Sequence, residues 1–240
     1  MISLITPCFN SEKTIEATIR SVYEQTYTNF EYIIIDGGST DNTVSIIEKW
    51  IPLFEGRLSY ISEADKGIYD AMNKGINMAQ GNLIGIVNSD DWYEKNTVEL
   101  VTKHYTGADY EVVYGMQRTV SGTKEIMVFI KSHEFLPDNM ITHPTCFVTK
   151  KTYQDFGYFD LTYKSSADYD FMLKIFFNKK VKFTPVYSIL SNFAAGGMSS
   201  GQVGIRENAR IKLKYGIISN KKSKFIIVKS HLYEFLTKKK

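Results

Sequence analysis

Four short apolar runs recur in the first half of the chain. They cover residues 3–6, 32–35, 58–62 and 83–87; each is followed by polar residues, and the first three also by a segment of helical periodicity. The second run is apolar without alternation, which is typical of a strand covered on both faces of a parallel sheet. Repeated β-α units of this length join parallel strands through right-handed crossovers. The pattern predicts an α/β fold with a Rossmann-like, mostly parallel sheet and helices on both faces.

The pattern changes after about residue 110. A Ser-Gly pair at 121–122 separates apolar runs at 112–114 and 125–130, which predicts a β-hairpin. A helix is expected near 167–177, with strands near 181–183 and 186–190. Because no Ser/Pro-rich linker or repeat divides the chain, we expect one domain over 1–205. Its second half, about 111–205, continues the sheet of the first half, about 1–110, and closes over it.

Composition excludes several classes of protein. Of 240 residues, 43% are hydrophobic and 14% aromatic, which excludes disorder and a disulfide-stapled mini-fold. Cys8 and Cys146 lack metal-ligand spacing, so we expect buried free thiols in a reducing compartment. The chain starts in a strand-like run rather than a signal peptide, and no apolar stretch approaches the roughly 18–20 residues that span a bilayer. These features predict a soluble, cytoplasmic protein.

Charge is unevenly distributed along the chain. Residues 210–240 carry ten Lys or Arg and one acid, whereas the other 209 residues have a net charge of −6. Residues 221–236 mix apolar side chains with lysines, as an interfacial amphipathic segment does. We expect a basic, amphipathic C-terminal helical tail at 206–240 that meets an anionic membrane surface. The alternative is a helix that packs on the body or on a second subunit of a homodimer. Nucleic-acid binding is not expected, because no reading motif accompanies the basic residues.

Polar residues follow each of the four predicted strands. Ligands of an open parallel sheet bind beyond the carboxyl ends of its strands, so these side chains should surround one crevice. Converging carboxylates need an offsetting cation, and hard oxygen ligands suit Mg²⁺ or Mn²⁺ with a substrate diphosphate. No Walker loop or GxGxxG motif offers another phosphate cradle. The residues at these strand ends are Pro7, Phe9 and Asn10, then Asp36, then Asp65 and Asp70, then Asp90 and Asp91, and all of them except Pro7 and Phe9 are polar.

Four strings carry a resemblance to a known family. They are SLITPCFN (3–10), IIIDGGSTDNT (33–43), EADKGIYDAMNKGINMAQGNLIGIVNSDDWY (63–93) and SSADYDFMLKI (165–175). In this order and spacing they resemble family 2 glycosyltransferases of the A-type fold, of the bacterial polysaccharide-biosynthesis type. The resemblance implies inverting transfer of a sugar from a nucleotide-sugar, most often UDP-linked, to a glycan or lipid-linked acceptor, with Mn²⁺ or Mg²⁺. An enzyme of this kind works in the cytoplasm or peripherally on the inner face of the cell membrane.

The resemblance also assigns nucleotide contacts. Pro7 and Phe9 would line the nucleobase pocket, and Asp36 would accept a hydrogen bond from the uracil imide. The alternatives are core packing for Phe9 and a capping role for Asp36 in the turn that follows it. The remaining implied nucleotide contacts are Asn10, Asp65, Lys66, Asn88 and Asp90.

The metal motif departs from the common family form. Asn88-Ser89-Asp90-Asp91 stands where the family has its DxD motif, with an amide in place of the first carboxylate. Asp90 is the expected metal ligand, and Asp91 is a second metal, ribose or supporting residue. Gly37 stands where many members have another Asp.

Asp168 matches the general base of the family, although Ala167 replaces the usual preceding Glu. A carboxylate there would take the proton of the acceptor hydroxyl. The alternatives are that Asp168 caps its helix, or that Asp170 is the base. His143 and Asp70 are implied acceptor or diphosphate contacts, and Gly196 and Gly197 resemble the hinge of a closing loop. Two other functions stay open: an inactive nucleotide-sugar-binding scaffold, and a sugar-phosphate nucleotidyltransferase.

Overall fold

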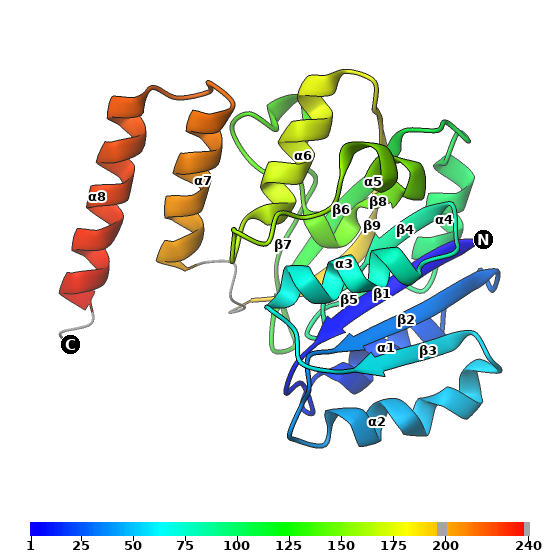
Figure 1. Cartoon of the computed structure of the whole chain (residues 1–240). Helices are drawn as coiled ribbons and strands as arrows, with labels where there is room; N and C mark the ends of the chain where they lie inside the picture. Colours follow the sequence, from blue (N-terminus) through cyan, green and yellow to red (C-terminus); the bar gives the residue numbers. More distant parts are fainter. Residues whose placement is uncertain (196–200, 238–240) are drawn as a thin grey trace.

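The computed structural model describes residues 1–195 and 201–237, which form a mixed α/β structure around one sheet (Figure 1). Within that part of the chain, nine strands join in the order β3-β2-β1-β4-β8-β6-β9-β5, and β7 pairs with β6 at the side. The strands are β1 (Ile2–Cys8), β2 (Phe30–Asp36), β3 (Leu58–Ser62), β4 (Leu83–Ile86), β5 (Trp92–Tyr93), β6 (Glu111–Ser121), β7 (Lys124–Phe129), β8 (Phe147–Thr149) and β9 (Lys182–Ala194). The expected continuous α/β sheet is therefore confirmed.

Helices cover both faces of the sheet. The α-helices are α1 (Ile15–Tyr23), α2 (Thr43–Trp50), α3 (Ile68–Met78), α4 (Thr97–His104), α5 (Lys150–Phe156), α6 (Ala167–Asn178), α7 (Gln202–Lys214) and α8 (Asn220–Thr237). Three 3₁₀ turns cover Ile51–Phe54, His133–Phe135 and His143–Thr145. None of the helices in the described ranges combines the length and hydropathy that crossing a bilayer requires.

The first half of the sheet forms as the apolar runs predict. Strand β1 pairs in parallel with β2 on one side and with β4 on the other, and β2 pairs in parallel with β3. Successive side chains of a strand point to opposite faces. Ile5 therefore joins a core with residues of α3 and α6, whereas Leu4 joins a second core with residues of α1 and α2.

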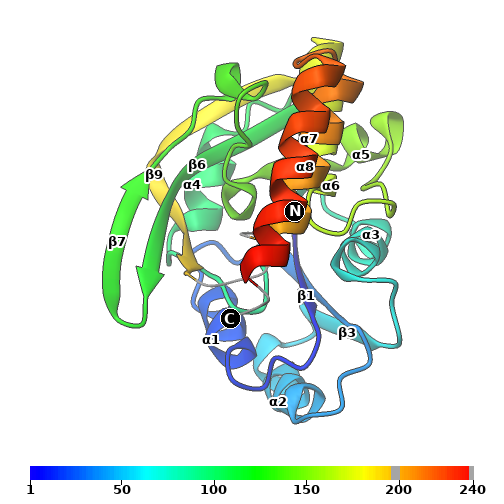
Figure 2. The ribbon, with the colours of Figure 1, turned by 90° about the vertical axis from the view of Figure 1, so that its left-hand side faces the viewer.

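The second half is less regular than the first. The predicted hairpin forms between β6 and β7, and β8 pairs antiparallel with both β4 and β6. The prediction of two short strands near 181–183 and 186–190 is wrong. A single strand, β9, runs from Lys182 to Ala194 and pairs in parallel with β6. Figure 2 shows β6, β7 and β9 curving together along one side of the molecule. Gly85 of β4 leaves the space that the ring of Phe147 in β8 occupies, which lets the two halves join closely.

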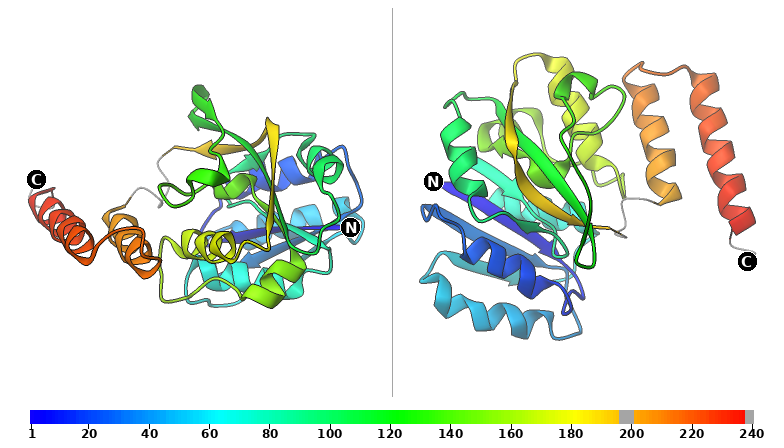
Figure 3. Two further views of the ribbon diagram at one scale, coloured as in Figure 1. Left: turned by 90° about the horizontal axis from the view of Figure 1, so that it is seen from above. Right: turned by 180° about the vertical axis from the view of Figure 1, so that it is seen from behind.

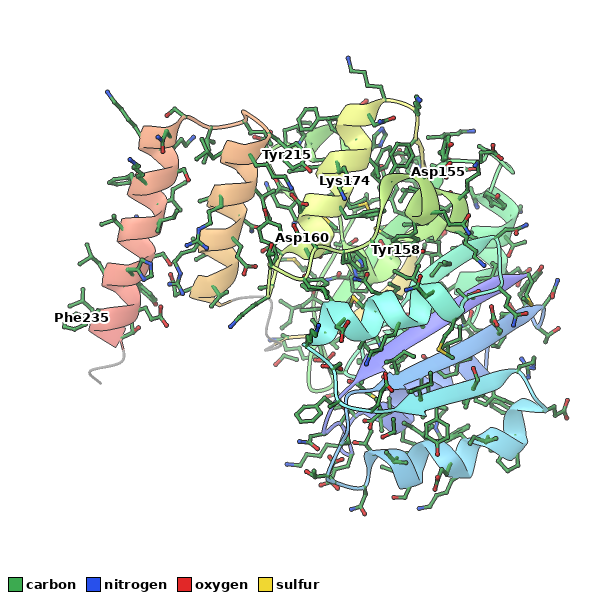
Figure 4. All side chains as sticks on the ribbon, in the orientation of Figure 1. Asp155, Tyr158, Asp160, Lys174, Tyr215 and Phe235 are labelled. Atoms are coloured by element: carbon green, nitrogen blue, oxygen red, sulfur yellow. The ribbon has the colours of Figure 1, made fainter. Side chains whose placement is uncertain are left out.

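The C-terminal helices stand in a row outside the sheet. Figure 3 shows α6, α7 and α8 following one another outward from the sheet. Helix α7 is fixed to the body because Ile211 is fully buried in the α3–α6 core. Its Lys214 pairs with Asp170 of α6 at 2.8 Å, and Figure 4 shows Tyr215 close to α6. Helix α8 packs on α7.

Candidate active site

The loops after β1, β2 and β4 meet at the carboxyl edge of the sheet. The backbone N–H of Asn10 donates to Ser39 Oγ at 2.7 Å, and Asn10 Oδ1 accepts the N–H of Thr40 at 2.9 Å. The hydroxyls of Ser11 and Ser89 lie 2.8 Å apart, which links the first loop to the loop after β4. The strand ends thus form one continuous polar rim, as the sequence pattern predicts.

Phe9 and Pro7 lie at this rim in different environments. The side chain of Phe9 is 59% exposed, so the alternative that Phe9 packs in the core is wrong. Pro7 is buried in β1, opposite Ile35. The exposed ring of Phe9 leaves an aromatic face that a planar ligand can cover.

The carboxylate of Asp36 is fully buried and binds the protein's own donors. It accepts the backbone N–H groups of Gly38 and Ser39 at 3.1 and 2.9 Å and the hydroxyl of Ser62 at 2.7 Å. The Ser39 hydroxyl and the Cys8 thiol also donate to it. A carboxylate has about four lone-pair sites, so these donors saturate it. In this arrangement Asp36 shapes the loop after β2, in the manner of an Asx turn, and has no surface exposed to a ligand.

Asp65 lies directly over Gly37. A Cβ atom on Gly37 would come within 2.5 Å of Asp65 Oδ2, so the carboxylate occupies the space that a side chain at position 37 would need. Asp65 Oδ1 accepts the N–H of Gly67 at 2.8 Å, which holds the side chain in place. The half-buried Asp65 therefore presents a carboxylate beside the loop after β2, next to the position where the family often has an Asp.

Asp90 and Asp91 have different environments. Asp91 is fully buried and accepts the N–H of Ala194 at 3.1 Å, and it also accepts the amide of Asn88 at 3.4 Å. Burial, together with the neighbouring charge of Asp90, raises the pKa of Asp91 to about 8. Asp90 is half-buried and lines an open hollow of about 220 Å³ with Lys13 and Trp92. Of the two aspartates, Asp90 is the one placed to meet a ligand.

Oxygen donors at this edge fit a hard divalent cation. Asn88 Oδ1 is buried and has no hydrogen-bond partner among the described residues, and Asp90 adds a carboxylate two residues later. No group of three His, Cys, Asp or Glu residues with metal-site geometry occurs within 1–195 and 201–237. Mg²⁺ and similar ions commonly take one or two protein ligands and complete their shell with water and substrate phosphate. The residues present fit that mode of binding.

Asp168 stands in the first turn of α6 and is held by a residue from the other half of the domain. Its Oδ1 accepts a hydrogen bond of 2.8 Å from the Tyr69 hydroxyl of α3. Burial and the charge of Asp168 raise the pKa of Tyr69, so the phenol stays protonated and is the donor. Asp168 is not the N-cap residue of α6, which is Ser166, but it is an acidic residue of the first turn, where its charge favours the helix dipole.

Asp170 points to a different partner. It is 1% exposed and receives the ammonium of Lys214 at 2.8 and 3.0 Å on its two oxygens. Tyr215 donates to the backbone carbonyl of Asp170 at 3.2 Å. The contacts of Asp170 thus join α6 to α7, while Asp168 faces α3.

His143 completes the cluster around Asp168. It begins the 3₁₀ turn His143–Thr145, and its ring lies 5.8 Å from that of Phe159 in an edge-on contact. Burial lowers the pKa of His143, and the nearby charge of Asp168 opposes that effect. The imidazole is therefore mainly neutral near neutral pH.

The remaining expected residues lie elsewhere or are not described. Asp70 accepts the backbone N–H of Lys66 at 3.0 Å and so stabilises the turn before α3, and the Lys66 side chain is exposed. Gly196 and Gly197 fall outside the described residues. Tyr69 lies inside the 63–93 string but could not be singled out from the sequence, because a buried tyrosine on a helix is usually a packing residue.

Comparison with known proteins shows the family of the chain. A family model described as "Glycosyl transferase family 2" matches residues 3–171. A PGL/p-HBAD biosynthesis glycosyltransferase of Mycobacterium bovis is 29% identical over 203 residues, which are 83% of this chain and 79% of that protein.

Two solved structures have a similar fold. S. aureus TarS 1–349 in complex with UDP-GlcNAc aligns with a TM-score of 0.71 and 21% identity, over 95% of this chain and 71% of TarS 1–349. The mannosyltransferase PcManGT from Pyrobaculum calidifontis, in complex with GDP-Man and Mn²⁺, aligns with a TM-score of 0.68 and 19% identity, over 97% of this chain and 69% of that one. The chain has the A-type glycosyltransferase fold and belongs to glycosyl transferase family 2.

Proposed function

We propose that this protein is a metal-dependent, inverting glycosyltransferase that moves a sugar from a UDP-sugar to a hydroxyl of a glycan or lipid-linked acceptor in cell-surface polysaccharide assembly. The observation that carries the proposal is the placement of Asp168. One of its oxygens is held by Tyr69 at 2.8 Å. Its Oδ2 accepts no hydrogen bond within residues 1–195 and 201–237, and this oxygen would be the one that meets the substrate.

The nucleotide would lie on the rim formed by the loops after β1 and β2. The exposed Phe9 ring would cover the base, and Asp65 would accept the imide N–H of uracil. Asp36 would act indirectly, by holding the loop against which the base lies, because its carboxylate is saturated by internal donors. Asp65 would thus take the contact with the uracil base that the family resemblance implies for Asp36. Asn10 braces the same two loops.

The diphosphate would lie at the hollow beside Asp90. Asn88 Oδ1 and the Asp90 carboxylate would hold Mn²⁺ or Mg²⁺, which when bound neutralises the charge that develops on the leaving diphosphate. Lys13 lines the same hollow and adds a cation on that side. Asp91 would support this edge from inside by holding the N–H of Ala194, at the end of β9.

Asp168 would act as the general base. Its free oxygen would take the proton of the acceptor hydroxyl while that hydroxyl oxygen attacks the anomeric carbon from the face opposite the diphosphate. The new glycosidic bond forms as the bond to the diphosphate breaks, so the anomeric configuration inverts. Tyr69 is a positioning residue in this scheme, since its hydroxyl touches the base and not the substrate. The neutral His143 would lie on the acceptor side.

The test begins with nucleotide binding. We expect UDP to raise the melting temperature in the presence of Mn²⁺ or Mg²⁺, and we expect GDP, CDP and ADP, or UDP with EDTA, to have a smaller effect. A panel of UDP-sugars is then screened for release of UDP, with acceptor glycans present. Asp168→Asn should keep the UDP-induced shift and lose turnover. Stabilisation by GDP alone would overturn the assignment of uracil as the nucleobase of the donor. Absence of any nucleotide effect would count against the donor site.

One alternative function is favoured by specific residues. Asn88, Gly37 and Ala167 each replace a carboxylate that the family often has, which is compatible with a nucleotide-sugar-binding scaffold that has lost activity. Such a scaffold would show the UDP-induced shift, but it would release no UDP from any sugar donor. Turnover that disappears in Asp168→Asn excludes it.

A further inference from the structure

Helix α8 has one face fixed against α7. Ser223 and Ser230 are buried there, and their hydroxyls bond to the Ala209 carbonyl at 3.1 Å and to Gln202 Oε1 at 2.8 Å. Arg206 of α7 forms an ion pair with Glu234 of α8 at 2.8 Å. Small side chains and polar bonds therefore set both the separation and the rotation of the two helices, and they fix which face of α8 points outward.

The opposite face of α8 carries large apolar side chains in water. Phe225, Val228, Leu232 and Leu236 recur at intervals of three and four residues and are 68%, 56%, 58% and 65% exposed. This spacing places them in one stripe along the helix. Figure 4 shows Phe235 near the C-terminal end of α8, on the side away from α7. We call the four-residue stripe, together with its lysines, the α8 outer face.

Lysines flank the stripe on both sides. Lys221, Lys222, Lys224 and Lys229 are all exposed, and helical spacing places Lys224 on one flank and Lys229 on the other. The only acidic residue of α8 is Glu234, on the α7 side. The outer face is thus apolar along its middle and cationic along its edges, whereas residues 1–209 have a net charge of −6.

We propose that the α8 outer face docks in the interfacial layer of an anionic lipid bilayer. A helix that lies in this layer buries its apolar stripe among the acyl chains, and its lysines extend to the headgroup phosphates. The charge of the α8 outer face favours an anionic bilayer over the α8 outer face of a second copy of the chain. Two such faces would bring lysine edges together, whereas anionic headgroups complement the edges on both sides.

The docking surface is rigidly connected to the catalytic half. Glu207 of α7 accepts the backbone N–H groups of Lys164 and Ser165 at 2.8 and 2.9 Å, immediately before α6. Lys214 pairs with Asp170 in the first turn of α6. A membrane bound at α8 would therefore lie at a fixed orientation to α6, which carries Asp168. Such an arrangement suits an acceptor that is itself held in the bilayer.

The experiment is co-sedimentation of the full chain with vesicles. One set is phosphatidylcholine alone, and the other contains added phosphatidylglycerol. We expect sedimentation with the second set only, weakened by salt. Each lysine near the surface contributes about fivefold to the partition coefficient, so Lys224→Glu with Lys229→Glu should lower it at least about twentyfold. The double substitution Phe225→Ser with Leu232→Ser removes half of the apolar stripe and should abolish sedimentation with the vesicles that contain phosphatidylglycerol.

Matched control variants distinguish an effect of the α8 outer face from an effect of the total charge or hydrophobicity of the protein. Lys49→Glu with Lys103→Glu changes two exposed lysines elsewhere, and Leu53→Ser with Ile126→Ser changes two exposed apolar residues away from α8. Both control pairs should sediment like wild type, and all variants should keep the UDP-induced thermal shift. Failure of wild type to sediment with phosphatidylglycerol overturns the proposal, as does equal sedimentation of the α8 variants. Light scattering that shows a dimer, lost in the Phe225/Leu232 variant, would assign the face to a second copy instead.

Discussion

The hydroxyl of Tyr69 donates a hydrogen bond of 2.8 Å to Oδ1 of Asp168, across a separation of 99 residues. Tyr69 stands at the start of α3 and is 7% exposed, whereas Asp168 stands in the first turn of α6 and is half-buried. The bond therefore joins the half of the domain that holds the strand-end rim to the half that holds the proposed base. It fixes one carboxylate oxygen, and with it the direction of the other.

Replacing Tyr69 tests this positioning role. Tyr69→Phe keeps the ring and removes the hydrogen bond, so the carboxylate loses its fixed orientation. We expect kcat to fall about tenfold, within the contribution of a well-placed base, with KM for the donor little changed.

The control for Tyr69 is Tyr187→Phe, which removes a hydroxyl from a side chain that is 77% exposed. It should leave both kcat and KM unchanged. A Tyr69→Phe enzyme with wild-type kcat would show that the bond serves packing alone.

Substitutions of Asp168 and Asp170 should have different effects, the first on turnover and the second on stability. Asp168→Asn should lower turnover by about 10²–10⁴, the usual contribution of a general base, with little change in melting temperature. Asp170→Asn leaves Lys214 without its charged partner next to a buried site, so we expect a loss of about 1–2 kcal/mol in the free energy of unfolding. Urea titration and turnover measured on both variants check this. The reverse pattern, with Asp170→Asn folded and inactive, would transfer the role of base to Asp170.

The first half of the fold could be predicted from sequence because each element is coded locally. The predicted bounds of β1 to β4 agree with the structure to within two residues, since a strand covered on both faces has no alternative to a continuous apolar stretch. Strand β9 was predicted as two pieces because Pro185 interrupts it. In the structure Pro185 stays in register opposite Tyr114, and the register shifts only after Val186, where two residues of β9 are passed over; pairing of this kind is decided by the fold rather than by local sequence.

The residues of the candidate site likewise fall into those that the sequence indicates and those that only the fold brings together. Asp90 and Asp168 could be proposed from the sequence because they stand in motifs at strand and helix ends, and their roles stay predictions. The saturation of Asp36 was also within reach, since an Asp before Gly-Gly-Ser commonly bonds its own turn. Tyr69 and Glu207 could not be found, because their partners are distant in sequence and only the folded chain brings them together.

The two cysteines should resist alkylation in the native protein. Burial, with the charge of Asp36 as a further cause, raises the pKa of Cys8, and burial raises the pKa of Cys146. A raised pKa keeps the thiol protonated as pH increases, so labelling should rise much less between about pH 7 and pH 9 than that of an exposed thiol. Iodoacetamide labelling with and without urea measures this, with Cys146→Ser to assign the sites. Labelling of native protein as fast as glutathione would contradict the buried placement.

Gly37 and Asp65 should act together in nucleotide binding. A Cβ at position 37 would lie 2.5 Å from Asp65 Oδ2, so Gly37→Ala must push that carboxylate away. The contact is with the end of a side chain, so we expect stability to change by less than about 1 kcal/mol, while affinity for UDP falls about tenfold. Asp65→Asn should lower UDP affinity by a similar factor and reduce the preference for UDP over CDP, because the amide can donate to cytosine. The double variant should be no worse than either single one, since both remove the same contact. Calorimetry with UDP and CDP measures all three, and additive losses would place Asp65 outside the base pocket.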